Sequence, residues 1–197
     1  MFDSGVTAAV LISGLKSEVD VAQPIPDASY VGWLCSLEQT LYGEVIREQA
    51  RTEITGPPPD EIDLGDILPP AGADSLRFED IYAVYADKTQ LKKSTAASGP
   101  IFPDTYHKSG NALAYNTKTK PERMSIVFYV RPAIKTAAAG NVMLPYEFLD
   151  MARARLRGEA YKLCNEDALA AKWLADYNAL LESFAQWLDG KRPNFGV

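Results

Sequence analysis

The side chains that most often carry out chemistry in proteins are few in this chain and lie far apart. The 197 residues include one histidine, His107, and two cysteines, Cys35 and Cys164. A catalytic histidine needs a nucleophile or a carboxylate beside it, and nothing in the sequence around His107 suggests one. One histidine and two distant cysteines also lack the ligand spacing of a zinc site or a redox-active cysteine pair. We therefore expect no metal site, no cofactor and two reduced cysteines.

The carboxylates and glycines likewise lack the arrangement of a familiar active site. The acidic cluster at residues 60–66 does not have the ordered spacing of a calcium-binding loop, so a solvated linker or sheet edge is the simpler interpretation. The sequence contains no phosphate-binding loop, no dinucleotide-binding glycine motif and no nucleophile elbow. These observations predict a protein that is not an enzyme.

Two groups of basic residues are candidates for binding rather than catalysis. Arg153 and Arg157 are one helical turn apart and share a face, so they could pair with acids of another subunit or with a phosphate. A solvated helix face is the alternative. The stretch 118–123, which contains Lys118, Lys120 and Arg123, has the composition of an exposed basic loop. It is only a weak indication of nucleic-acid binding.

Charge is distributed unevenly along the chain, although the formal net charge is only −6. Residues 1–66 hold three basic and twelve acidic side chains, a net of −9, whereas residues 88–135 hold nine basic and two acidic ones, a net of +7. The overall negative charge does not favour non-specific nucleic-acid binding. The asymmetry is either ordinary solvated surface or a pair of faces that attract each other between identical subunits.

Helical periodicity occurs towards both ends of the sequence. We predict helices over residues 8–19, capped by Ser4 or Thr7, and over residues 29–51. A third helix opens at Pro145, and a fourth runs over residues 167–188. The fourth has an apolar stripe at steps of three and four, formed by Leu169, Trp173, Tyr177, Leu180, Phe184 and Leu188.

The middle of the chain, residues 67–132, loses the helical spacing. Residues 81–85 are rich in β-forming side chains, and residues 124–130 form an apolar strand whose two faces could both be covered. Shorter strands are expected near residues 90–94, 105–108 and 113–116, separated by turn residues. This pattern predicts a small antiparallel sheet.

The predicted fold is therefore α+β: an antiparallel bundle of four helices with a small antiparallel β-sheet inserted between its second and third helices. Residues 1–66 and 137–189 would form the bundle, residues 67–136 the β-rich insertion and residues 190–197 a C-terminal tail. The composition, 47% hydrophobic and 23% charged, is that of an ordinary globular chain. No apolar stretch is long enough for a membrane helix, and the first residues lack a basic secretion signal.

Three features together resemble the head–tail connector, or neck adaptor, proteins of tailed bacteriophages. A short helix precedes a long one with an aromatic-rich face at residues 30–51, and the β-rich middle begins after Leu68-Pro69-Pro70. The C-terminal pair is a proline-led helix rich in alanine and arginine, followed by a helix with Ala170, Trp173 and Tyr177 on one stripe. The resemblance covers most of the chain, but the β insertion departs from the purely helical members.

The resemblance implies a homo-oligomeric ring of about a dozen subunits in the virion neck, synthesised in the host cytoplasm. Such a ring binds the portal protein, extends the DNA channel without sequence-specific DNA binding, and receives the tail or a stopper or tail-terminator protein. The expected portal contact lies at the C-terminal tail and comprises Leu188, Lys191, Arg192, Pro193, Asn194 and Phe195. The expected contacts between subunits are Lys118, Lys120, Arg123, Arg153 and Arg157.

Two alternatives to a connector remain open. The chain could be another virion part, such as a head-completion or tail-terminator protein. It could also be a small non-enzymatic regulatory module that uses the arginine face. In the connector interpretation, an acidic helical face meets the basic β insertion of the next subunit and fixes the register of the ring.

Overall fold

The chain folds into two compact units. The computed structural model describes residues 1–21, 23–71, 73–94, 102–135 and 137–191. Residues 1–46, together with the chain from residue 134 onward, form a helical unit, and residues 47–133 form a β unit. Each unit is described by itself below.

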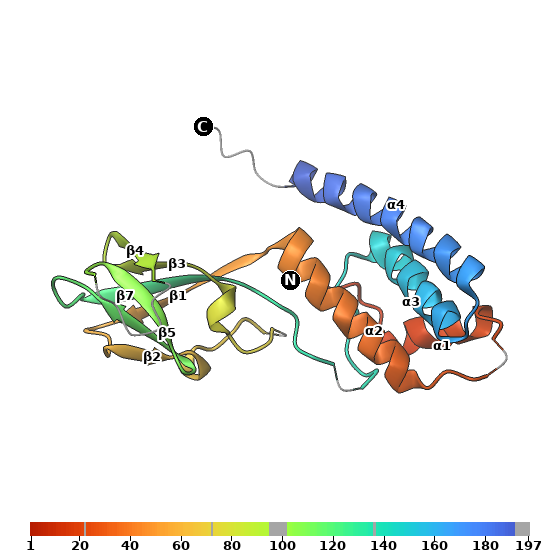
Figure 1. Ribbon diagram of the computed structural model, residues 1–197, viewed down its shortest axis with the longest axis horizontal. Helices are drawn as coiled ribbons and strands as arrows, with labels where there is room; N and C mark the ends of the chain where they lie inside the picture. Colours follow the sequence, from red (N-terminus) through yellow and green to blue (C-terminus); the bar gives the residue numbers. More distant parts are fainter. Residues whose placement is uncertain (22, 72, 95–101, 136, 192–197) are drawn as a thin grey trace. The chain divides into compact units, whose positions relative to one another are not determined.

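The helical unit contains four α-helices (Figure 1). They are α1 (Ala8–Glu18), α2 (Asp27–Thr40), α3 (Leu149–Leu163) and α4 (Asp167–Lys191). The predicted cap of the first helix is confirmed at Thr7, whose hydroxyl accepts a hydrogen bond from the Val10 N–H at 3.3 Å. A short 3-10 turn, Tyr146–Phe148, follows Pro145 and leads into α3.

Packing between α3 and α4 depends on a glycine. A Cβ atom at Gly158 would lie 2.8 Å from the Leu174 side chain, so a larger residue would force that side chain to move. Aromatic side chains cluster near the C-terminal end of α4. The centre of the Phe184 ring lies 4.8 Å from that of Phe148 and 6.0 Å from that of Trp187. The helical core also includes buried residues of α1, of α2 and of the π-helical turn after α2, among them Leu11, Leu15, Tyr30, Leu34, Leu41 and Tyr42.

The predicted second helix is too long. α2 ends at Thr40, a π-helical turn spans Leu41–Ile46, and Arg47 has a φ of +50°. The chain then continues as strand β1 (Gln49–Thr55), whose side chains alternate between exposed and half-buried. The helical apolar spacing stops at Ile46, and the alternation of Ala50, Thr52 and Ile54 takes over.

The β unit is built on one seven-stranded sheet with the order β1-β7-β3-β4-β5-β6-β2. The remaining strands are β2 (Glu61–Asp63), β3 (Ile81–Ala86), β4 (Thr89–Lys93), β5 (Thr105–Ser109), β6 (Ala112–Asn116) and β7 (Arg123–Tyr129). All neighbouring pairs are antiparallel except β4 and β5, which are parallel. The sheet curls into a half-barrel (Figure 1).

The predicted fold class is therefore wrong. The protein is a mixed α/β structure with a seven-stranded curled sheet and four helices, not a four-helix bundle that carries a small antiparallel sheet. Two strands were missed: the first three residues of β1 were assigned to the helix predicted over residues 29–51, and β2 was assigned to an acidic linker or edge. Both are edge strands of the sheet. An edge strand is paired on one side only and is less buried, so its sequence shows a weaker apolar pattern.

Strand β7 lies second from one edge of the sheet and is paired on both sides. Its residues Met124, Ile126 and Phe128 are at most 3% exposed, and Ser125 on the opposite face is also buried. Thr52 of β1 and Val84 of β3 flank Ile126 in the two registers. This position explains the largely apolar sequence of residues 124–130.

Candidate functional site

The arginine face of α3 divides into an internal and an external part. Arg157 forms an ion pair with Glu18 of α1, and its guanidinium lies 4.4 Å from the centre of the Trp173 ring of α4. Only 18% of the Arg157 side chain is exposed, and its buried Nε has no hydrogen-bond partner among the described residues. Arg157 therefore connects three helices of its own subunit.

Arg153 remains at the surface. Its guanidinium pairs at 2.7 Å with Asp150, one turn earlier in the same helix, and 44% of its side chain is exposed. Arg155 points elsewhere, to Glu159 at 2.7 Å and over the Tyr177 ring at 5.4 Å. Of the arginines on this helix, Arg153 is the most open to another molecule.

A groove of about 520 Å³ runs beside this face, lined by residues of α1, α3 and α4. Its lining includes Arg153, Arg157, Trp173, Asp176 and Leu180. Asp176 is exposed, and within the described part of the chain its carboxylate forms no ion pair. The groove lining thus combines apolar side chains, two ion-paired arginines and a carboxylate, Asp176, that has no ion pair among the described residues.

The basic stretch of the β unit precedes and enters strand β7. Lys118, Lys120 and Arg123 are all exposed. The Lys120 ammonium lies 3.9 Å from Asp60, whereas Lys118 and Arg123 have no ion pair among residues that the structure describes. The Asp87 carboxylate accepts the backbone N–H groups of Glu122 and Arg123 at 3.1 Å, so the turn also holds negative charge, but the side chains of Lys118 and Arg123 stay exposed.

The acidic and basic segments of the sequence do not coincide with the two folded units. Strands β1 and β2 bring acidic residues from the first third of the chain into the unit that holds the basic stretch. The β unit has eleven basic and twelve acidic side chains, a net of −1, and the helical unit has nine basic and fourteen acidic ones, a net of −5. Any attraction between subunits must therefore act between local patches.

The expected portal contact is placed only in part. Leu188 is 7% exposed and packs in the helical core, so it holds α4 in place. Lys191 is exposed at the end of α4, with its ammonium 5.3 Å from the Trp187 ring centre. Arg192, Pro193, Asn194 and Phe195 lie outside the described residues.

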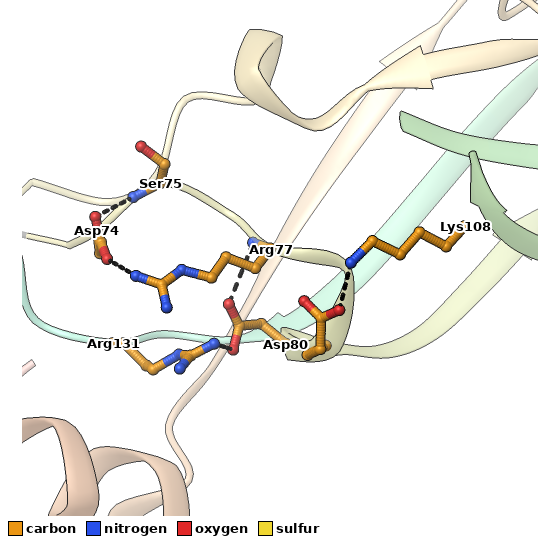
Figure 2. Close-up of polar contacts among 7 residues, drawn as sticks. Asp74, Ser75, Arg77, Asp80, Lys108 and Arg131 are labelled. Carbon is orange, nitrogen blue, oxygen red and sulfur yellow. Dashed lines mark hydrogen bonds and ion pairs between the residues drawn. The ribbon is translucent and has the colours of Figure 1, made fainter. Parts of the chain in front are cut away.

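A polar cluster that the sequence did not reveal anchors the segment before β3. Figure 2 shows Asp80, which is 8% exposed, accepting hydrogen bonds from the Arg131 guanidinium and from the Arg77 backbone N–H, the latter at 3.2 Å. The Arg77 side chain turns back to Asp74 at 2.6 Å. Because each charged group is compensated within the cluster, its role is to fix the chain entering β3.

A second contact holds the same segment to β5. The Lys108 ammonium donates to the Glu79 carboxylate at 2.6 Å. This hydrogen bond is the largest cause that lowers the pKa of Glu79 below its ordinary value. Both side chains are more than half exposed, so the contact is a surface ion pair.

The helical unit contains a buried ion pair that sequence reasoning also missed. Glu38 of α2 is 1% exposed and pairs with Lys135, while its other oxygen accepts the Met143 N–H at 2.8 Å. Burial raises the pKa of the Glu38 carboxyl above its ordinary value, and the Lys135 ammonium acts in the opposite direction. In the sequence, the one indication that Glu38 is buried is its position beside the apolar stripe of Leu34, Leu37 and Leu41.

His107 is the single histidine of the sequence. This residue lies half-buried on β5, and its Nδ1 has no hydrogen-bond partner among the described residues. The described ranges contain no cluster of three or more histidine, cysteine or carboxylate side chains that could hold a metal ion. Within the same ranges, none of the helices is both long and apolar enough to span a membrane.

No protein-family model matches the chain, and no curated protein matches it.

Proposed function

We propose that the chain is a structural subunit of a tailed-bacteriophage virion, which assembles into a head–tail connector ring that joins the portal to the tail and extends the DNA channel. The proposal rests on the resemblance of the helical segments to neck adaptors. The observation that supports it in the structure is two separate groups of exposed side chains of opposite charge, acids on α4 and basic residues before β7. A ring with head-to-tail contacts requires two different surfaces on every subunit.

The acidic residues of the proposed contact lie along α4, on more than one side of the helix. Asp167, Asp176 and Glu182 are exposed on this helix, and none has an ion pair among the described residues. The basic surface is the turn with Lys118 and Arg123. Because these acids, Lys118 and Arg123 form no ion pairs in the described part of the chain, contact between two copies would bring their charges together without breaking an existing pair.

Arg153 extends this proposed contact, whereas Arg157 does not. Arg153 lines the same groove as Asp176, and 44% of its side chain is exposed, so it can reach a neighbouring copy by exchanging its exposed pair with Asp150. The Arg157 guanidinium is already engaged by Glu18 and Trp173. Lys191 and the residues after it form the proposed portal contact, and the tail or a stopper protein would bind the opposite side of the ring.

Charge reversal tests the proposed ring contact. Ring formation in the presence of the portal protein is measured by sedimentation for the unmodified chain and for the double variant Lys118→Glu/Arg123→Glu at low and high salt. The proposal expects rings that weaken with salt and are lost in the double variant, with partial recovery when Asp176→Lys and Glu182→Lys are added. Lys88→Glu, an exposed change in the β3–β4 turn, is the control. This contact would be refuted if rings formed equally well at high salt and in the double variant.

A further inference from the structure

The outer edge of strand β1 has no paired strand in the described part of the chain, and its exposed side chains include an ion pair between Arg51 and Glu53 at 2.8 Å. β1 pairs with β7 on one side and is the terminal strand of the sheet on the other. It is seven residues long, contains no proline or lysine, and keeps an unbroken register with β7. Exposed edges are usually shortened, bulged or marked with such residues because they bind other strands. The opposite edge, β2, has only three residues and follows Pro57, Pro58 and Pro59.

One hydrogen bond next to the start of β1 shows which of its residues direct their backbone N–H and carbonyl groups towards β7. The Val130 N–H donates to the Glu48 carbonyl at 2.9 Å, so these two residues face each other as a hydrogen-bonded pair. Such pairs alternate along an antiparallel ladder. The backbone groups of Ala50, Thr52 and Ile54 therefore point to β7.

The backbone groups of the other residues in β1 point away from the sheet. These residues are Gln49, Arg51, Glu53 and Thr55, and their side chains are all exposed. In the part of the chain that the structure describes, no segment outside the sheet donates a backbone hydrogen bond to them or accepts one from them. Four residues thus offer an N–H and a carbonyl to an added strand.

The sequence of β1 is complementary to itself in one register. If two copies pair antiparallel with Thr52 opposite Thr52, each Arg51 faces the partner copy's Glu53. All seven residues of β1 then pair, and the outward-pointing backbone groups of Gln49 in one copy lie opposite those of Thr55 in the other. A shift of the partner by two residues in either direction would oppose Arg51 to Arg51 or Glu53 to Glu53, and like charges directly opposite destabilise a strand pair.

We propose that two copies of the free chain associate through their β1 edges, antiparallel and around a two-fold axis at Thr52, so that the two seven-stranded sheets become one. The contact is isologous, since the same surface serves both copies. It goes beyond the proposed ring and shares none of the charged residues of the ring contact. On the inner face of the joined sheet, Ile54 of each copy packs against Ala50 of the other, which covers a half-buried apolar side chain.

A charge-swap series tests the proposed pair. The full chain and the variants Arg51→Glu, Glu53→Arg and Arg51→Glu/Glu53→Arg are compared by sedimentation equilibrium, with Lys92→Glu as a control elsewhere in the sheet. The unmodified chain is expected to dimerise, each single variant to weaken the dimer about tenfold, and the double swap to restore it. An equimolar mixture of the two single variants should form heterodimers, because every facing pair then has opposite signs.

Cross-linking tests the register separately. Opposed residues in a non-hydrogen-bonded pair have Cα atoms about 4.5 Å apart, within the range of a disulfide. In a Cys164→Ser background, Thr52→Cys should give a covalent dimer on mild oxidation, and Thr55→Cys should not. A chain that stays monomeric at high concentration would overturn the proposal, as would a dimer that is indifferent to Arg51→Glu. Either result leaves the ring contact at Lys118, Arg123 and Asp176 standing, because that contact is tested by different residues.

Discussion

Lys135 and Glu38 form an ion pair inside the helical unit, with 9% and 1% of their side chains exposed. The second Glu38 oxygen accepts the Met143 N–H, so one carboxylate fixes two points of the segment that leads to α3. Taking two charges out of water is costly, and the pair is compensated only while both partners are present. The connection between α2 and this segment therefore depends on an interaction between residues 97 positions apart.

Loss of Lys135 should destabilise the protein strongly. Lys135→Met leaves a buried carboxylate without its counter-charge and should lower the free energy of unfolding by roughly 3–5 kcal/mol. Denaturant unfolding measures the loss. The double variant Lys135→Met/Glu38→Gln, which keeps an acceptor for Met143, should lose clearly less than the single variant. Equal losses would show that the pair contributes nothing as a pair.

The same variant should also depend on pH in a defined direction. A carboxyl whose pKa is raised in the folded state binds its proton more tightly there, so stability increases as the pH falls towards the ordinary glutamate pKa. The deficit of Lys135→Met relative to the unmodified protein should therefore be largest at neutral pH and shrink in mild acid. A deficit that is constant over this pH range would contradict the assignment of a buried charge.

Arg157 and Arg153, one turn apart on α3, should respond differently to removal. Arg157→Met loses the Glu18 pair and the Trp173 contact and should cost about 1–2 kcal/mol of stability, since partly buried charged contacts are worth more than exposed ones. Arg153→Met breaks an exposed pair and should change stability by less than about 0.5 kcal/mol. Thermal unfolding of both variants checks the contrast, and similar losses would argue against the internal role of Arg157.

Replacing two helical glycines by alanine should change the stability in opposite directions. Alanine is favoured over glycine in a helix by about 1 kcal/mol, and Gly14 of α1 has open space around it, so Gly14→Ala should raise the stability. Gly158→Ala should lower it, because the added methyl group displaces Leu174 at a cost of roughly 1–3 kcal/mol. The measurement is the unfolding midpoint. Stabilisation by both changes would mean that α3 and α4 are not closely packed at Gly158.

Glu79 offers a local test of the contact between the segment before β3 and strand β5. Its pKa is lowered chiefly by the hydrogen bond from Lys108, so an NMR titration should find this carboxyl ionising below its ordinary range. A lowered carboxyl pKa stabilises the folded state above the ordinary value, and this contribution is lost as the pH falls through the folded-state pKa. Lys108→Met should move the pKa back upward. An unchanged pKa in that variant would remove Lys108 as the cause.

The elements with a strong local pattern were predictable from sequence, and those defined by distant partners were not. The stripe of α4 is repeated often enough to identify a helix, and the run around Ile126 is a strand because β7 is covered on both faces. By contrast, β1 is an edge strand whose half-buried face is formed only by pairing with a segment about 70 residues later. Its residues also directly follow a genuine helix, which made the helical pattern look continuous.

The polar contacts were hidden for a related reason. Neither Glu38 nor Asp80 stands in a recognisable motif, and their partners, Lys135 and Arg131, are distant in sequence. The arginines of α3 could be placed on helix faces by spacing alone. Which of them is engaged within the subunit depends on α1 and α4, and spacing within one helix carries no information about that.

The central claim is that this chain forms a ring on a portal protein, and co-sedimentation with the portal from the same genome tests it most directly. The experiment compares the full chain with a version that ends at Asp189. The account predicts a stable complex with many copies arranged in a ring, and loss of binding on truncation because the portal contact includes Lys191 and the residues that follow it. Failure of the full chain to bind the portal at any salt concentration would contradict the connector function itself.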